Sequence, residues 1–404
     1  MIFATRNSRA TWHRRSNAVV LLHLCAGLAV AGLQRRWPPD WLLVHVLLLG
    51  AATNAIVIWT AHFTNTLLPA QARAASNVGW VPLAALNVGV VSVLVGAERD
   101  AAPLAVAGAA LVVLVVTWHG IAMAAAVRRA RKARFGPVVR FYCAAAAALL
   151  AGASIGAALE VGVSAEWYSR LYAAHIQLNI FGWIALTVLG TQSAFWPMVL
   201  RTRMVAGAET ALRHALPLCA GGLATTVAGL LAGSRLVAAI GVCGYLLGAL
   251  RALEPFARTA MQRRPGSPAA LMLSAATCWF LAGLAADLGE LVAAKTLSEF
   301  AAAISNFVPW LVAGFVVQVL LGALTYLLPV VVGGGPAGGR RMSALLDRYG
   351  IIRVLVFHVG TLIAAVSSGG FGMGIGWALV GVAILAFCAL AGAAIVDQRR
   401  PAGD

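Results

Sequence analysis

Residues 175–203, HIQLNIFGWIALTVLGTQSAFWPMVLRTR, form a long apolar run that ends in Arg201 and Arg203. At 100° per residue, one face of such a helix carries mostly polar or small residues: His175, Asn179, Gly182, Leu186, Gly190 and Ser193. An imidazole and an amide are costly in hydrocarbon without a partner, so this face should point into a helix bundle and away from lipid. The stretch therefore predicts an inner membrane-spanning helix, with His175 packed against another inner helix.

The composition of the whole chain agrees with a membrane protein. Of 404 residues, 61% are hydrophobic and 11% are charged, and the mean hydropathy is +0.88, whereas an average soluble domain has roughly 25% charged residues. The net charge of +17 comes from short basic clusters between the apolar runs, so membrane orientation explains it and nucleic-acid binding is not expected. The six cysteines are scattered without a CxxC pair, which indicates neither a disulfide framework nor a thiolate zinc site.

Twelve apolar runs are long enough to cross a bilayer. They lie near residues 17–33, 41–63, 77–97, 103–127, 140–163, 171–195, 214–232, 236–254, 269–289, 305–332, 351–369 and 377–396. The first run, after a basic segment, also has the form of a secretory signal, but we favour a membrane helix. With a cytoplasmic N-terminus, 24 of the 30 lysines and arginines fall on the inner side, which predicts a multi-pass protein of the inner (plasma) membrane with both termini cytoplasmic.

An internal repeat is indicated by three glycines. Gly50, Gly182 and Gly314 are 132 residues apart and fall in the second, sixth and tenth runs. In this register Asn54 aligns with Leu186 and Gln318. We therefore expect a single all-α polytopic domain over residues 1–404, built from three four-helix repeats (17–127, 140–254 and 269–396) with three inner helices.

Histidines are the main candidates for chemistry. Six of the eight lie in or at the edge of the predicted spans: His23, His45, His62, His119, His175 and His358. Imidazole is the usual protein ligand of haem iron and of copper. A hydrogen-bonding role in helix packing is the alternative for each of them taken singly.

Helical position ranks these histidines. His175 lies on the polar face of its helix and is the first candidate, with His62 second. His45 and His62 are 17 residues apart, about 25 Å along a helix, so they cannot bind the same ion. His119 and His358 are expected as partners in a cytoplasmic-side layer. The predicted cofactor-binding set is therefore His175, His62, His45, His119 and His358, with His175, His45 and His62 as metal ligands.

Other patterns are less informative. The chain has no HExxH, CxxCH, P-loop or GxGxxG sequence, and GGGPAGG at 333–339 predicts a cytoplasmic turn. Asp287 and Glu160 lie near the outer ends of predicted spans, where a carboxylate can gate protons or bind cations. We expect these two to be hydrated at the interface.

Two stretches resemble a known group: HVLLLGAATNAIVIWTAHF at 45–63 and HIQLNIFGWIALTVLGTQSAFWPMVLRTRM at 175–204. They are similar to the membrane region that precedes the cupredoxin domains of actinobacterial multicopper-oxidase or copper-nitrite-reductase-like fusion proteins, as is WLVAGFVVQVLLGALTYLLPVVVGG at 310–334. The resemblance implies a copper-related membrane protein, although no cupredoxin domain follows in this chain.

More distantly, twelve spans with histidines on the second and sixth resemble subunit I of haem-copper oxidases and the related membrane proteins of nitrosative-stress response. That family has histidines on its tenth span and a His-His pair on its seventh. Neither is present here, so an oxygen or nitric-oxide reductase is not expected. The resemblance leaves a scaffold that holds one haem, one copper, or neither.

Three functions follow as hypotheses. The first is a haem- or copper-binding protein for electron transfer or metal handling. The second is a transporter of a neutral or weakly polar solute, suggested by the repeat and by the scarcity of charge in the spans. The third is a membrane partner or assembly subunit for an extracytoplasmic cupredoxin-type protein, docked on the outer acidic segments around Glu160, Glu166, Glu290 and Glu299. Solvated loop charge explains these acidic segments equally well.

Overall fold

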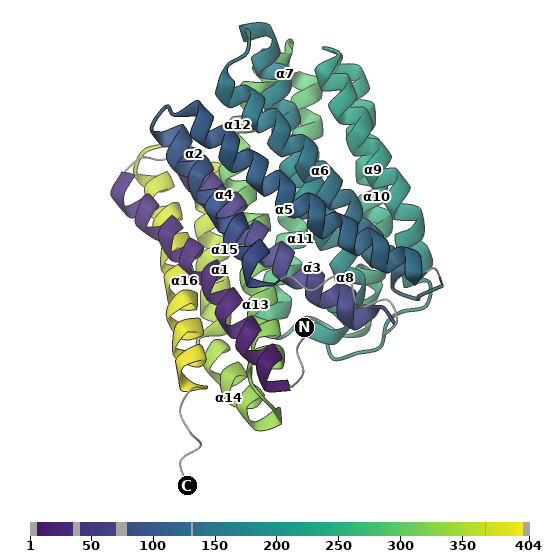
Figure 1. The fold of residues 1–404 in the computed structure, drawn as a ribbon, viewed down its shortest axis with the longest axis vertical. Helices are drawn as coiled ribbons and strands as arrows, with labels where there is room; N and C mark the ends of the chain where they lie inside the picture. Colours follow the sequence, from purple (N-terminus) through teal and green to yellow (C-terminus); the bar gives the residue numbers. More distant parts are fainter. Residues whose placement is uncertain (1–5, 35–40, 70–78, 131, 368, 399–404) are drawn as a thin grey trace. The chain divides into compact units, whose positions relative to one another are not determined.

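The chain folds as an all-α polytopic membrane protein. The computed structural model describes residues 6–34, 41–69, 79–130, 132–367 and 369–398, and every regular element within these ranges is a helix (Figure 1). Among them, eleven helices are long and apolar enough to cross a membrane, and a bent helix pair supplies a twelfth if it counts as one span. The predicted fold class is confirmed.

The described helices fall into two compact units. Unit 1 comprises residues 1–55, 265–280 and 307–404, and unit 2 comprises residues 56–264 and 281–306. Three of the four boundaries between the units lie inside helices, namely α3 (Thr53–Leu67), α11 (Pro268–Ala293) and α12 (Leu297–Leu311), and the fourth, at 264/265, lies between two helices. The three-repeat division of the sequence stays a prediction.

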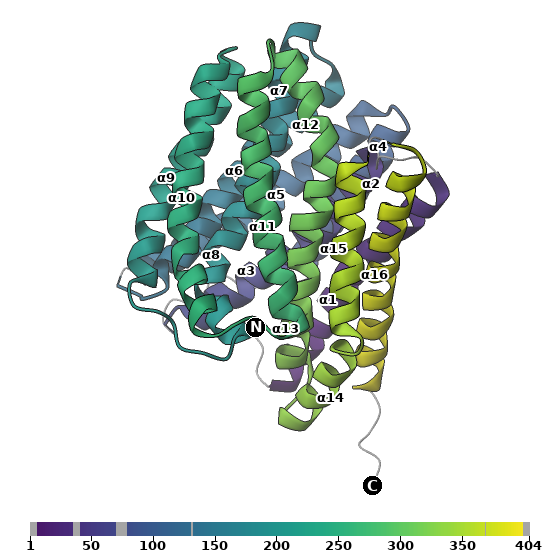
Figure 2. The same ribbon diagram turned by 180° about the vertical axis from the view of Figure 1, so that it is seen from behind.

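Unit 1 is centred on the segment that follows α12. Its elements are α1 (Arg6–Gln34), α2 (Trp41–His45), η1 (Val46–Ala52), η4 (Val312–Val317), α13 (Gln318–Val332), α14 (Pro336–Leu346), α15 (Gly350–Val366) and α16 (Gly370–Asp397). The η4–α13 segment packs on α1, η1 and α14, and the buried rings of Phe280 and Phe315 lie 5.1 Å apart. Helices α15 and α16 run side by side, as Figure 2 shows.

Unit 2 is centred on the segment that contains residues 175–203. Its elements are α4 (Trp80–Glu98), α5 (Ala102–Arg129), α6 (Gly136–Val161), α7 (Ala165–Ile176), η3 (Gln177–Ala185), α8 (Leu186–Val199), α9 (Ala208–Leu231) and α10 (Arg235–Gln262). The α7–η3–α8 segment packs on α6, α9 and α10. Helices α9 and α10 form a tight hairpin (Figure 1), because Gly222, Gly229 and Gly241 let the two backbones touch.

Three candidate spans are buried more deeply than the rest. The most apolar windows of Ala165–Val199, Leu297–Val332 and Trp41–Leu67 are 83%, 72% and 61% buried, against 33–56% for the other spans. These are the sixth, tenth and second spans. The prediction that residues 175–203 form an inner helix is confirmed by this burial.

Each of these three spans contains a π-helical segment. Gly50 lies in η1, Gly182 in η3 and Gly314 in η4. A π-turn adds a residue per turn and loosens the backbone hydrogen bonding, and such turns are frequent at functional sites. Side chains take up several of the carbonyls: Thr53 donates to Leu48 (2.9 Å), and Tyr245 donates to Phe181 (2.6 Å).

Some predicted boundaries are wrong. Helix α1 begins at Arg6, eleven residues before the predicted start, because basic residues are compatible with helix beyond the hydrocarbon. The GGGPAGG stretch is a turn only as far as Gly335, since Pro336 opens the helix α14, where the fixed φ of proline suits the first turn. Helix α14 meets α15 at a bend of 44°.

Candidate functional site

His175 lies on α7 and packs on α6. Its Nδ1 is 2.9 Å from the carbonyl oxygen of Gly152, which can only accept, so Nδ1 carries the proton and donates it. A β-carbon added at Gly156 would lie 2.8 Å from the imidazole Cε1. Gly156 therefore makes room for the ring, and Gly152, one turn earlier, makes room for the Asn179 amide, which would lie 2.7 Å from a β-carbon there. The neutral imidazole has its lone pair on Nε2.

The rest of the polar face of this helix also packs on α6. The amide of Asn179 donates to the carbonyl of His175 (2.7 Å), and a β-carbon at Gly182 would lie 2.5 Å from Cβ of Ala148. The predicted face does point into the bundle. However, the partner of His175 is α6, whose span is only 33% buried, so the expectation of an inner-helix partner is wrong. Glycines in α6 provide the close approach that the sequence analysis assigned to an inner helix.

His119, on α5, is the most deeply buried of the predicted histidines, at 1% exposed. Thr60 donates its hydroxyl hydrogen to the Ile56 carbonyl (2.6 Å), so its oxygen accepts from Nε2 of His119 (2.8 Å). Nδ1 of His119 is buried without a hydrogen-bond partner. This imidazole therefore presents one lone pair inside the helix bundle of unit 2.

The remaining predicted histidines have separate surroundings. His45 stacks on Trp41 at 4.2 Å and its Nδ1 donates to the Trp41 carbonyl (2.8 Å). His62 lies edge-on to Trp59 and Phe63, on the same helix. His358 accepts from the indole of Trp279 (3.2 Å).

The described residues do not bring the predicted ligands together. They contain no group of three His, Cys, Asp or Glu side chains that could hold a metal ion. His175, His62 and His119 contact different partners within unit 2, and His45 and His358 do so within unit 1. The described ligand set therefore does not fit a multi-ligand copper site, and haem or copper binding stays a prediction.

His23 was not among the predicted cofactor-binding residues, but its ring is held between two elements of unit 1. It is buried on α1 with Nδ1 3.0 Å from the Val19 carbonyl. Its ring lies directly against Gly50 of η1, where a β-carbon would collide with Cδ2. Gly50 is one of the three repeat glycines. The spacing of the glycines, and not the position of the histidine, is therefore the sequence feature that could have indicated this contact.

Asp287 of α11 forms a buried hydrogen bond within unit 2. The residue is 0% exposed, and its Oδ1 accepts from Nε2 of Gln177, the first residue of η3, at 2.7 Å. Its Oδ2 is buried without a partner, and none of the ion pairs formed by the described residues involves it. The expectation that Asp287 is hydrated at the interface is wrong.

Two further hydrogen bonds near this pair link four helices of unit 2. Ser305 of α12 donates to Tyr172 of α7 (3.1 Å), five residues before Gln177. Arg235 of α10 donates to the carbonyl of Leu291 (3.0 Å), one turn beyond Asp287 on α11. The sequence analysis named Asp287 but not its partner Gln177, because no sequence pattern pairs two residues that are 110 positions apart.

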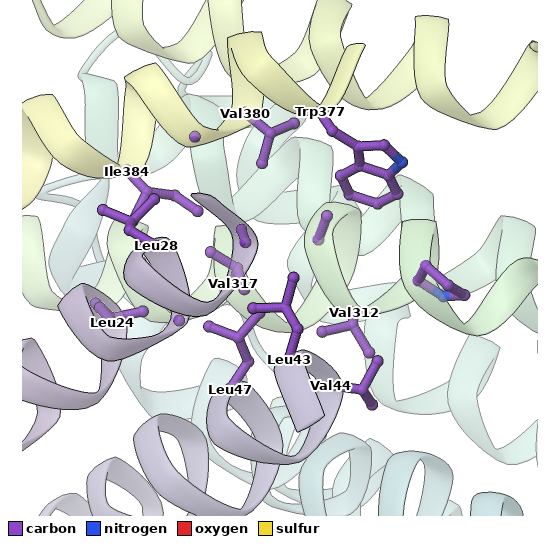
Figure 3. Close-up of a pocket in the computed structure, with 15 residues that line it drawn as sticks. Leu24, Leu28, Leu43, Val44, Leu47, Val312, Val317, Trp377, Val380 and Ile384 are labelled. Atoms are coloured by element: carbon purple, nitrogen blue, oxygen red, sulfur yellow. The ribbon is translucent and has the colours of Figure 1, made fainter. Parts of the chain in front are cut away.

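A groove in unit 1 has a different character. Its cavity volume is about 50 Å³, and Figure 3 shows lining side chains from α1, α2, η1, η4 and α16. Leucines and valines dominate, and Trp377 and Val380 of α16 lie across the groove from Leu43 and Leu47 (Figure 3). Such a surface accommodates hydrocarbon and offers no metal ligand.

Comparisons with known proteins give no family. No family model and no curated protein matches this sequence.

Proposed function

We propose that this chain is a transporter of a neutral or weakly polar solute whose cycle binds and releases a proton at Asp287. The supporting observation is the fully buried carboxyl group with one oxygen held by Gln177 and the other without a partner. Ionisable residues inside membrane spans are rare, and transporters use them as proton relays. The charge distribution of the sequence favours the inner (plasma) membrane, with both termini cytoplasmic.

A proton suits this site better than a metal cation. An isolated carboxylate is too costly to bury in a low-dielectric interior, so it takes up a proton and becomes neutral. Hard cations such as Ca²⁺ need six or more oxygen ligands, and the described residues contain no cluster of three His, Cys, Asp or Glu side chains. In the neutral state, Oδ2 carries the proton and Oδ1 still accepts from Gln177.

The position of Gln177 connects this proton to a conformational change. Asp287 lies six residues, about 9 Å, from the end of α11, and the residue is 0% exposed. Gln177 is the first residue of η3, and a shift of this π-turn moves its amide relative to the carboxyl group. Loss of that hydrogen bond together with hydration would release the proton, and the hydrogen bond would reform on closure.

The test compares Asp287→Asn with Glu290→Gln in the full-length protein. Asn keeps an acceptor for Gln177 but cannot release a proton, whereas Glu290 is half-buried on the same helix and serves as the matched control. In infrared spectra of the reconstituted protein, we expect a protonated-carboxyl band that Asp287→Asn removes and Glu290→Gln retains. Solute uptake should require the wild-type residue and respond to an imposed pH gradient.

Two results would contradict the proposal. One is an infrared spectrum in which the Asp287→Asn variant loses no protonated-carboxyl band. The other is a broad panel of neutral and weakly polar solutes whose uptake does not differ from that of empty vesicles, or does not differ between the wild type and Asp287→Asn.

Haem or copper binding is the second candidate, and His119 is the residue that favours it. Its buried imidazole has one nitrogen held by Thr60 and the other without a partner, an arrangement in which the second nitrogen is available as a ligand. The group would supply electron transfer. We propose a reduced-minus-oxidised spectrum with iron and copper analysis for the wild type, His119→Ala, and the exposed control His214→Ala. A wild type without a Soret band and with substoichiometric metal excludes this candidate.

A further inference from the structure

Gln318 is a fully buried amide inside a membrane span. It is the first residue of α13, directly after η4, and it is 0% exposed. Neither its Oε1 nor its Nε2 has a hydrogen-bond partner. A carboxamide brings two donor hydrogens and two acceptor lone pairs, and buried polar side chains are otherwise nearly always hydrogen-bonded.

The chain contains its own comparison for this residue. Asn54 follows Gly50 by four residues, just as Gln318 follows Gly314, and both glycines lie in π-helical segments of unit 1. Nδ2 of Asn54 donates to the Gly50 carbonyl at 2.8 Å, so this amide is bonded to its own helix. Gln318 makes no equivalent bond, and its amide is left for another partner.

The segment of α11 that faces η4–α13 is apolar. A β-carbon at Gly314 would lie 2.5 Å from the indole of Trp279, and one at Gly322 would lie 3.0 Å from Cβ of Met272. Helix α11 therefore runs antiparallel to η4–α13. Residues 268–280 and 312–332 contain no acidic residue, lysine, arginine or histidine.

We propose that Gln318 is the recognition residue of a buried site in unit 1 that holds a small uncharged molecule with a hydrogen-bond donor and acceptor. An uncharged occupant matches a recognition residue that is itself neutral and two facing segments that carry no charged side chain. A donor and an acceptor follow from the free carbonyl and the free amide nitrogen. Water and a neutral solute with a hydroxyl or amide group share this chemistry. The site does not depend on the proton exchange proposed at Asp287.

The first test is Gln318→Met, which keeps the length of the side chain and removes all its hydrogen bonds. The same substitution at the exposed helix end, Gln262→Met, is the control. If a bound molecule satisfies the amide, Gln318→Met should melt several degrees below both the wild type and the control. An amide without a partner is costly, so an unchanged or higher melting temperature for Gln318→Met would overturn the proposal.

The second test is a high-resolution cryo-EM map of the purified full chain, which decides the matter even if Gln318→Met does not fold. We expect density other than protein within hydrogen-bonding distance of both Oε1 and Nε2. A compact density that persists in every preparation identifies water, and an extended density that disappears after purification in solute-free buffer identifies a solute. A map in which the amide bonds only to protein atoms, or faces no density, refutes the site.

Discussion

The α9–α10 hairpin gives a sharp test of how unit 2 is held together. A β-carbon added at Gly222 would lie 2.7 Å from the Gly241 carbonyl oxygen and 2.8 Å from Cα of Tyr245, and it would also collide with the Tyr245 backbone nitrogen. Ordinary contacts begin at 3.4 Å, so α10 would have to move by at least about 0.7 Å. The neighbouring Gly221 has open space around its Cα. Gly222→Ala and Gly221→Ala therefore form a matched pair.

The expected difference between the two variants follows from what they share. Both gain the same helix propensity, up to about 1 kcal/mol for Gly to Ala, so this contribution cancels in the comparison. What remains is the overpacking at Gly222, about 1–3 kcal/mol, since a gap of about 0.5–1 Å already removes a quarter to a half of each affected dispersion contact. Membrane helices associate chiefly through such contacts.

The assay is thermal unfolding of both variants in the same mild detergent at one scan rate, because unfolding of membrane proteins is often irreversible. Gly222→Ala should melt a few degrees below Gly221→Ala, at about 2–4 °C per kcal/mol for a chain of 150–250 residues and less for a longer one. A Gly222→Ala protein that melts at or above Gly221→Ala would show that the two backbones are not in contact and would refute the packing of the hairpin.

Three further substitutions test individual hydrogen bonds by the same assay. Tyr245→Phe removes the donor to the η3 carbonyl and should cost about 0.5–1.5 kcal/mol, whereas the same change at the exposed Tyr349 should have no effect. Thr60→Val removes the hydrogen-bond partner of the buried His119 and should destabilise the protein. Thr64→Val, one turn later, removes a buried hydroxyl that has no partner and should be neutral or stabilising. For His175, Ala should lower stability by about 0.6–2 kcal/mol through loss of the bond to α6, and Gln should be tolerated if packing is its role; loss of bound haem or copper in both variants would instead identify a ligand.

The membrane class and the order of the spans could be predicted because they depend on composition and run length alone. A run of about 20 apolar residues has few alternatives to a membrane helix, and each of the predicted runs corresponds to a helix, with α15 crossing only together with α14. The ends were less predictable. Helices continue past the hydrocarbon into the interface, where arginines such as Arg14 and Arg15 in α1 are tolerated.

The relative rotation of residues on either side of a π-helical segment could not be predicted from the sequence. The faces were assigned at 100° per residue, which holds for an α-helix. Between His45 and Asn54 the chain passes through η1, and a π-turn advances by a smaller angle per residue, so the relative phase of the two residues changes. A sequence gives no direct sign of a π-turn. Here the three repeat glycines mark the π-helical segments, because a neighbouring side chain lies very close to the helix backbone at each of them.

The error at Asp287 has a physical cause that also bears on the proposed function. The predicted span ended at residue 289, which put the carboxyl group two residues from the edge, where water would solvate it. Helix α11 instead continues to Ala293, six residues beyond Asp287, and Asp287 is 0% exposed within the bundle. A buried carboxyl group needs hydrogen-bond partners from the protein for both of its oxygens. The amide of Gln177 supplies one hydrogen bond, to Oδ1, and Oδ2 has none. A purely structural carboxyl group would be expected with both oxygens bonded or with a basic partner. One bonded oxygen beside a π-turn is therefore the observation on which the proposed proton exchange at Asp287 rests.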